Sequence, residues 1–159
     1  MFIPLRVHSV YSKGKGGATL EELASWAFQK KLPCAALSDI ENLHGWGKWK
    51  RLGLESGFTP LFGCELKIQE RRFLFVVRSR EGYWNLMETL NHKEVRKTEG
   101  LAVVFIPQPE DEELPQVLST LPGEALYLGA DFFNLKKAFT LAQSRGLPLV
   151  WANPLKFIK

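Results

Sequence analysis

The sequence predicts an α/β fold in which about seven strands and their connecting helices form a closed or nearly closed β/α barrel. Short apolar runs alternate with helical patterns along the chain, which favours parallel strands joined by right-handed crossovers. The 159 residues suffice for one buried core, and no repeat or linker divides them, so we expect a single domain over residues 1–159. An open doubly wound sheet is the alternative that the alternation alone leaves open.

The first three predicted elements are a strand, a helix and a second strand. The apolar run "LRVHS" at residues 5–9 predicts the first strand. Residues 18–31 predict a helix, because apolar residues recur at helical spacing and Thr19 with Glu22 forms a capping box that satisfies free backbone N–H groups. Residues 33–39 are largely apolar, as in a strand buried on both faces of a sheet.

A weaker helix, two strands and a clearer helix come next. Residues 41–57 have a helical pattern, although internal glycines lower its helix propensity. Residues 59–68 and 71–79 predict the third and fourth strands, because both are rich in apolar and aromatic residues. Residues 81–95 predict a helix with one apolar face.

The last part of the chain completes the alternation. Residues 101–107 and 125–130 predict two further apolar strands, and 147–154 predict the last strand. The acidic, proline-containing stretch 108–125 between the first two predicts a loop with at most a short helix. Residues 134–146 predict a helix, since apolar residues share one face and a glycine stands at the expected C-terminal end.

Composition and charge restrict the class of protein. An apolar fraction of 45% and a charged fraction of 24% are ordinary for a globular domain. No apolar run approaches the roughly 20 residues of a membrane span, and no signal pattern precedes the first strand, so we expect a cytoplasmic protein without a membrane partner. The net charge of +4 permits a nucleic-acid or phosphate partner without requiring one.

The stretch "HGWGKWKR" is the strongest nucleic-acid signal in the chain. It interleaves Trp46 and Trp49 with Lys48, Lys50 and Arg51, and aromatic rings beside cations can stack bases and hold phosphates. Tryptophans three residues apart on a helix more often form one packing face with solvated lysines beside it. A basic nucleic-acid-binding accessory protein is therefore an alternative function.

Three residues of metal-ligand type lie at or near the ends of successive predicted strands. In a β/α barrel the functional groups gather at the C-terminal ends of the strands. His8, Asp39 and Glu65 occupy such positions. Imidazole and carboxylate groups bind divalent metals such as Zn or Mn, which makes a metal-dependent phosphoesterase or exonuclease that uses these three residues a second alternative.

Several motifs together resemble one known family. The blocks "H-S-x-Y-S", "S-D-x-x-N-L-x-G" and "G-C-E" stand in order at residues 8–12, 38–45 and 63–65. They resemble the PHP (polymerase and histidinol phosphatase) domain found at the N-terminus of the bacterial DNA polymerase III alpha subunit. The resemblance extends over nearly the whole chain, with a shortened region at 108–125. It implies a distorted seven-stranded TIM-like (β/α) barrel and a metal cluster that hydrolyses phosphoesters.

The ligands that the resemblance implies are mostly absent. His8 and Glu65 remain as vestigial ligands, and Ile40 stands where a histidine is implied. Cations occupy four of the other positions, namely Arg6, Lys15, Arg72 and Lys156. Arginine has no acceptor lone pair and stays protonated. A fixed cation about 4 Å from a divalent metal is repelled by roughly 8 kcal/mol at an effective dielectric constant of 20.

These substitutions predict a degenerate site that holds no metal. A buried carboxylate still requires a positive partner. We therefore expect Arg6 or Lys156 to form a salt bridge with Glu65 or Asp39, so that basic side chains compensate charge that metals once compensated. A residual anion site that binds phosphate or pyrophosphate is the functional alternative for the same cations.

The resulting prediction is a catalytically degenerate PHP-domain protein related to the DNA polymerase III alpha subunit. The resemblance implies a structural or protein-docking role and a protein partner in the replication machinery, with no cofactor. A single short domain leaves no room for polymerase activity of its own. The metal-dependent phosphoesterase and the nucleic-acid-binding accessory protein stay open as alternatives.

Overall fold

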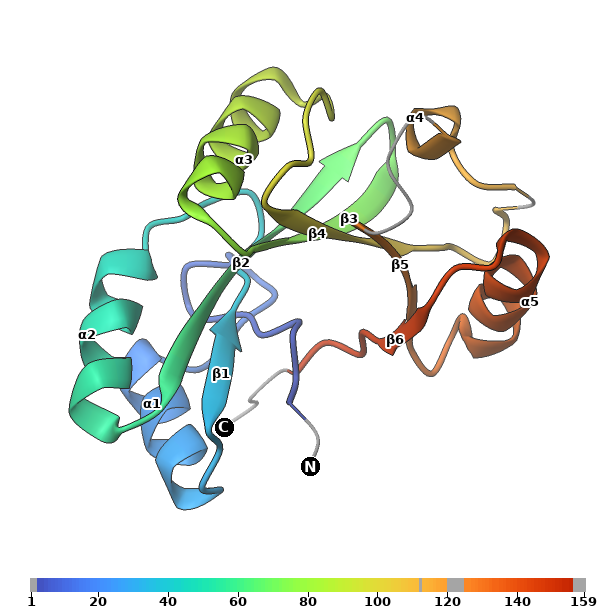
Figure 1. Ribbon diagram of the computed structural model, residues 1–159. Coiled ribbons are helices and arrows are strands. Elements are labelled where there is room, and N and C mark those ends of the chain that lie inside the picture. The colour runs from blue at the N-terminus through green and yellow to red at the C-terminus, as the bar shows by residue number, and fades with distance from the viewer. Residues whose placement is uncertain (1–2, 112, 120–124, 156–159) are drawn as a thin grey trace. The chain divides into compact units, whose positions relative to one another are not determined.

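The computed structural model describes residues 3–111, 113–119 and 125–155 (Figure 1). The chain divides into two compact units, Met1–Glu65 with Pro154–Lys159, and Leu66–Asn153. The first unit holds α1 (Leu20–Gln29), β1 (Cys34–Leu37), α2 (Trp46–Ser56) and most of β2 (Thr59–Ile68). The second holds the end of β2 and then β3 (Arg71–Val77), α3 (Arg80–His92), β4 (Leu101–Ile106), α4 (Gln116–Ser119), β5 (Leu126–Ala130), α5 (Leu135–Arg145) and β6 (Leu149–Trp151).

The first unit packs two helices beside a parallel pair of strands. β1 pairs with β2 in register from Cys34 opposite Thr59 to Leu37 opposite Phe62. The predicted capping box is confirmed at the start of α1, where Thr19 accepts from the backbone of Glu22 and the Glu22 side chain reaches back. The apolar faces of α1 and α2 and the inner side of β1 form a common hydrophobic core.

The predicted strand over residues 5–9 is wrong, because this segment forms only isolated bridges. Val7 pairs with Leu155 and Ser9 pairs with Ala18. Side chains accept hydrogen bonds from backbone N–H groups that would otherwise pair with a neighbouring strand. The Val7 N–H donates to Ser38 Oγ at 2.7 Å, and the Ser9 N–H donates to an Asp39 carboxylate oxygen at 2.7 Å. These side-chain contacts compete with strand pairing and hold the segment in an irregular conformation.

The second unit contains an antiparallel strand pair that the sequence did not indicate. β3 pairs antiparallel with β4, whereas β4–β5 and β5–β6 are parallel. The chain reverses its direction between β2 and β3, at Gln69 and Glu70, whose φ angles are positive at 49° and 64°. β3 therefore runs opposite to β4 as well. So short a connection joins only antiparallel strands, so the expectation of an all-parallel sheet is wrong.

Six strands are present in the described part of the chain, where seven were expected, and their order is β1-β2-β3-β4-β5-β6. The remaining predicted strands and helices are confirmed with shifted ends, and α4 is the short helix expected within the loop 108–125. In the second unit Phe73, Phe75 and Phe105 are fully buried at the centre of the core. Among the described helices, none is both long and apolar enough to span a bilayer.

The loop between Ser9 and Ala18 depends on a close backbone approach at Gly16. Val10 donates to the Ala18 carbonyl at 2.9 Å, and Gly16 donates to the Ser12 carbonyl at 3.0 Å, so the loop folds back on itself. A Cβ atom at Gly16 would collide with the carbonyl oxygen of Ser9. Glycine is therefore required here by backbone packing.

We predict that Gly16→Ala lowers the free energy of unfolding by at least about 2 kcal/mol, because backbone atoms must move to relieve the collision. Gly47→Ala is the matched control, since a Cβ at this helical position meets nothing within 4 Å. Urea-induced unfolding measured by circular dichroism compares the two variants. Equal stability of Gly16→Ala and Gly47→Ala would contradict this account of the loop.

Candidate functional site

Glu65 is the centre of a buried ionic cluster in the first unit. Arg6 donates from Nε to Oε2 and from Nη2 to Oε1 of Glu65, both at 2.7 Å. His8 Nε2 lies 2.8 Å from the same Oε2. Relative exposure is 4% for the Arg6 side chain and 6% for that of Glu65. The expected salt bridge between Arg6 and Glu65 is therefore present, as a bidentate pair away from bulk water.

The geometry keeps Glu65 ionised. Burial raises the pKa of this carboxyl, but the hydrogen bonds from His8 and Arg6, together with the charge of Arg6, outweigh burial and lower the pKa to about 2. A carboxylate with so low a pKa is a poor proton donor or general base near neutral pH. Both oxygens are engaged, so the group is suited to hold neighbouring side chains in place.

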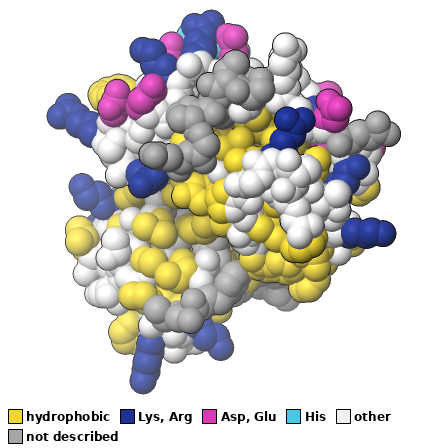
Figure 2. All heavy atoms as spheres, turned by 45° about the vertical axis from the view of Figure 1, so that its right-hand side comes forward, with side chains coloured by type: hydrophobic (Ala, Val, Ile, Leu, Met, Phe, Trp, Pro, Cys, Tyr) yellow, Lys and Arg dark blue, Asp and Glu magenta, His cyan; other side chains and the backbone are white. Residues whose placement is uncertain are grey.

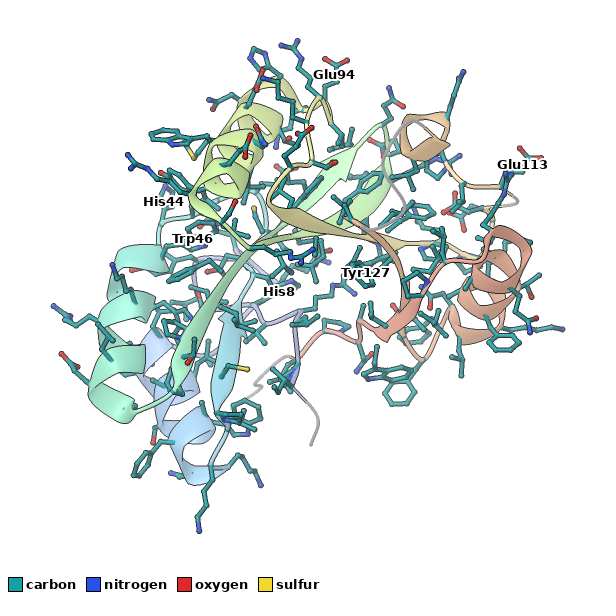
Figure 3. The ribbon with its side chains drawn as sticks, in the orientation of Figure 1. His8, His44, Trp46, Glu94, Glu113 and Tyr127 are labelled. Carbon is teal, nitrogen blue, oxygen red and sulfur yellow. The ribbon has the colours of Figure 1, made fainter. Side chains whose placement is uncertain are left out.

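His8 contributes one ring nitrogen to this cluster and leaves the other unused. Because an ionised carboxylate only accepts hydrogen bonds, Nε2 carries the proton in the contact with Glu65. His8 Nδ1 is buried and has no hydrogen-bond partner among the described residues. Figure 3 labels His8, which follows the segment that bridges to Leu155.

Asp39 has a separate environment made of hydroxyl and backbone donors. Its Oδ1 accepts from the Ser9 N–H at 2.7 Å and from Ser12 Oγ at 2.6 Å, and its Oδ2 accepts from Ser9 Oγ at 2.8 Å. Ser12 Oγ also accepts from the backbone N–H of Ile40 at 2.9 Å. Asp39 thus fastens the loop after His8 to the end of β1.

The structure places the proposed cations in different surroundings. Arg6 lies in the buried cluster, whereas Lys15 is exposed in the loop between Ser9 and Ala18. Arg72 belongs to β3 in the second unit, where it pairs with Ile106 across the strands. Lys156 lies outside the described residues. Among the ion pairs found in the described part of the chain, Arg6 is the cation that contacts Glu65.

The basic and aromatic stretch at α2 is mainly a packing and ion-pairing element. Trp49 is 1% exposed and donates its indole N–H to the Ala35 carbonyl at 3.3 Å, so it is not free to stack on a base. Lys48 pairs with Glu21, and Arg51 faces Glu55 at 3.8 Å. Lys50 is exposed, and Trp46 lies at the start of α2 near His44 (Figure 3).

The serine hydroxyls of the site were not assigned roles from the sequence. Ser9 and Ser12 hold Asp39, and Ser38 both accepts from and donates to the backbone of Val7. The signal was available in the "H-S-x-Y-S" and "S-D" blocks, because buried serines beside an aspartate commonly hydrogen-bond to it.

The donor atoms near Glu65 do not form a metal-binding set. In the ranges that the structure describes, no group of three or more His, Cys, Asp or Glu side chains gathers so as to hold a metal ion. The two oxygens of Glu65 accept from Arg6, and those of Asp39 accept from serines. The cluster can therefore position backbone segments and hold buried charge.

Comparison with known sequences gives a consistent family match. The chain matches the PHP domain family over residues 4–121. It is similar to the DNA polymerase III subunit alpha of Escherichia coli strain K12, with 27% identity over 201 residues that cover 99% of this chain and 17% of that protein. It is also similar to the error-prone DNA polymerase of Symbiobacterium thermophilum, with 32% identity over 111 residues that cover 67% of this chain and 10% of that protein. The chain thus spans between 10% and 17% of the length of these two relatives.

A solved structure has a similar fold. A two-domain protein from Bacteroides vulgatus, described as containing a predicted PHP-like metal-dependent phosphoesterase, superimposes with a TM-score of 0.65 at 12% identity. The match covers 95% of this chain and 50% of that one. At this identity the likeness concerns the mixed α/β fold.

We predict that Arg6→Met lowers the free energy of unfolding by about 3 kcal/mol, because it leaves a buried carboxylate without its cation. Arg51→Met is the matched control, since the Arg51–Glu55 pair is exposed and worth less than about 1 kcal/mol. Urea titration at pH 7 measures both. A loss for Arg6→Met no larger than that for Arg51→Met would show that the buried pair does not stabilise the fold.

We also predict a specific acid dependence. The pKa of Glu65 is lowered from 4.5 to about 2 in the folded chain, so its contribution is complete above pH 4.5 and is lost as the pH falls toward 2. This contribution is about 3 kcal/mol. Between pH 5 and pH 3 the free energy of unfolding should fall more steeply for the natural chain than for Glu65→Gln, in urea titrations at each pH. If the free energy of unfolding changed with pH equally in the natural chain and in Glu65→Gln, the lowered pKa of Glu65 would be refuted.

Proposed function

The chain belongs to the PHP domain family, and from that premise we propose that it is a catalytically degenerate member that acts as a structural or protein-docking module. The observation that carries this proposal is the bidentate contact of Arg6 with Glu65 at 2.7 Å. The guanidinium lies against the carboxylate where a PHP-type site would need metal-binding oxygens.

The residues around Glu65 fit a metal poorly. A metal ligand must offer a lone pair, and the guanidinium of Arg6 has none to offer. Its fixed positive charge, in contact with both oxygens of Glu65, would repel a divalent cation bound to the same carboxylate. The Nδ1 atom of His8 carries a lone pair and has no hydrogen-bond partner among the described residues, but one imidazole does not make a structural or catalytic metal site.

Arg6 supplies the electrostatic part of a metal's role. A buried carboxylate without a cation is strongly destabilising, and the bidentate pair removes that penalty while His8 adds a third hydrogen bond. Such a substitution preserves the fold without preserving hydrolysis. A preserved fold without hydrolysis supports a domain whose role is to bind other proteins.

We propose further that both units form one PHP-type domain. The family match at residues 4–121 runs through both of them. The segment around Val7 would take the place of the seventh strand of a distorted TIM-like barrel, because Val7 bridges to Leu155 and its carbonyl accepts from the Ser38 N–H at 2.8 Å. The relatives are DNA polymerases, which supports a partner protein in DNA replication.

Metal content and phosphoesterase activity test the proposal. We expect the purified chain to contain no stoichiometric metal and to hydrolyse bis(p-nitrophenyl) phosphate with Mn²⁺ or Zn²⁺ no faster than Glu65→Ala does. Arg6→His restores an imidazole two residues before His8 and should increase zinc uptake over the natural chain, measured by plasma mass spectrometry. Stoichiometric metal together with turnover that Glu65→Ala abolishes would instead establish a metal-dependent phosphoesterase.

A further inference from the structure

The second unit presents an exposed apolar surface at the start of α5. Phe132 and Phe133 are 75% and 89% exposed, and Leu135 and Phe139 on the helix are 49% and 51% exposed. Phe132 also packs edge-on against Trp151 of β6, with ring centroids 5.0 Å apart. We call these five residues the α5 aromatic face. Figure 2, which turns the right-hand side of Figure 1 forward, shows hydrophobic side chains gathered on the molecular surface.

A buried hydrogen-bond network fixes the turn that carries the two phenylalanines. Asp131 accepts from the N–H groups of Phe133 and Asn134 at 2.9 and 3.0 Å, and Asn134 Oδ1 accepts from the Asp131 N–H at 2.7 Å. The Asn134 amide donates to the Pro107 and Gly129 carbonyls at 2.8 and 3.2 Å, which ties the turn to the ends of β4 and β5. Asp131 and Asn134 are both buried.

This arrangement differs from ordinary surface apolar residues. Single exposed side chains, such as Phe28 or Leu54 in the first unit, are common and need no partner. Large apolar residues grouped on one turn and helix form a patch of the kind that marks an interaction site. Because the turn is held by buried hydrogen bonds, little conformational freedom would be lost on binding.

The charge around the face indicates what covers it. Lys136 and Lys137 follow Leu135 at the start of α5, and residues 132–149 contain no aspartate or glutamate, whereas Arg145 at the far end of the helix lines a hollow with Glu110 and Glu113. Two copies of this chain meeting through the face would bring the two lysines of each copy together, which disfavours self-association. A partner with carboxylates at the rim of an apolar stripe would complement both the rings and the lysines.

We propose that the α5 aromatic face binds an acidic amphipathic protein segment. Its apolar stripe would cover Phe132, Phe133 and Phe139, and carboxylates beside the stripe would meet Lys136 and Lys137. This inference deepens the docking role proposed above and rests on it, because it supplies the surface and the chemistry of the partner. Exposed aromatic anchors on a rigid support commonly carry most of the affinity of such contacts.

A displayed library of short helical peptides tests the proposal directly. Leucine is fixed along one face of every peptide, and Glu, Lys or Ser varies equally at the flanking positions. We expect selection on the full chain to retain peptides enriched in Glu. Binding of retained peptides, measured by fluorescence anisotropy, should weaken at least about tenfold for Phe132→Ser with Phe133→Ser, and should weaken as salt rises. Lys136→Glu with Lys137→Glu should shift the selection toward Lys.

The control is Phe28→Ser, which removes an exposed ring from α1 and should leave peptide binding unchanged. Circular dichroism checks that each variant is folded, as expected for side chains so exposed. Failure to retain any peptide, retention without a Glu excess, or equal binding to the variant that lacks Phe132 and Phe133 would overturn the inference. Concentration-dependent dimerisation in sedimentation experiments, abolished by the same variant, would assign the face to a second copy instead. Phosphoester turnover would overturn the proposed degenerate function without bearing on this surface.

Discussion

The bidentate ion pair between Arg6 and Glu65 is the interaction on which the organisation of the first unit depends. Both groups are almost fully buried, so each would be strongly destabilising without the other. Arg6 directly precedes Val7, which bridges to Leu155. Glu65 lies in β2 and forms an isolated bridge with Ile40. The pair therefore ties the irregular segment that contains Arg6 to strand β2. The serine contacts of Asp39 perform the same task for the loop that follows His8.

Local patterns predicted most elements, and nonlocal competition explains the exceptions. Apolar spacing located α1, α3 and α5, because a helix of a globular domain commonly buries one apolar face. On α5 the face predicted from the sequence is buried at Ala138 and Ala142 and exposed at Leu135 and Phe139. The segment at residues 5–9 has a strand-like composition, yet side chains from Ser38 and Asp39 occupy its backbone groups. Such competition depends on residues about 30 positions away and is invisible to a local pattern. The antiparallel β3 follows from two consecutive residues with positive φ, neither of them glycine.

The site was predicted where chemistry restricts the choice of partner and missed where it does not. A buried glutamate requires a cation, which made Arg6 a natural partner for Glu65. Lys15 stood in an equally suggestive position, but a flexible basic side chain in a loop is readily solvated, and it is exposed. The α5 aromatic face gave no signal in the sequence, since Phe132 and Phe133 follow an apolar strand and resemble core residues. Their exposure arises from the turn that Asp131 and Asn134 impose.

A guanidinium and a metal ion overlap in one property and differ in the others. Both neutralise a buried carboxylate, and a planar guanidinium fixes its orientation through two parallel hydrogen bonds. A metal ion can in addition coordinate a water molecule and lower its pKa so that it becomes a nucleophile, which a guanidinium cannot do. In the function proposed above, placing Arg6 on Glu65 separates the structural role of the cation from the catalytic one. Under the proposed function, a domain that keeps the first and gives up the second is useful for the surfaces that its fold displays, and the α5 aromatic face is the surface proposed for that role.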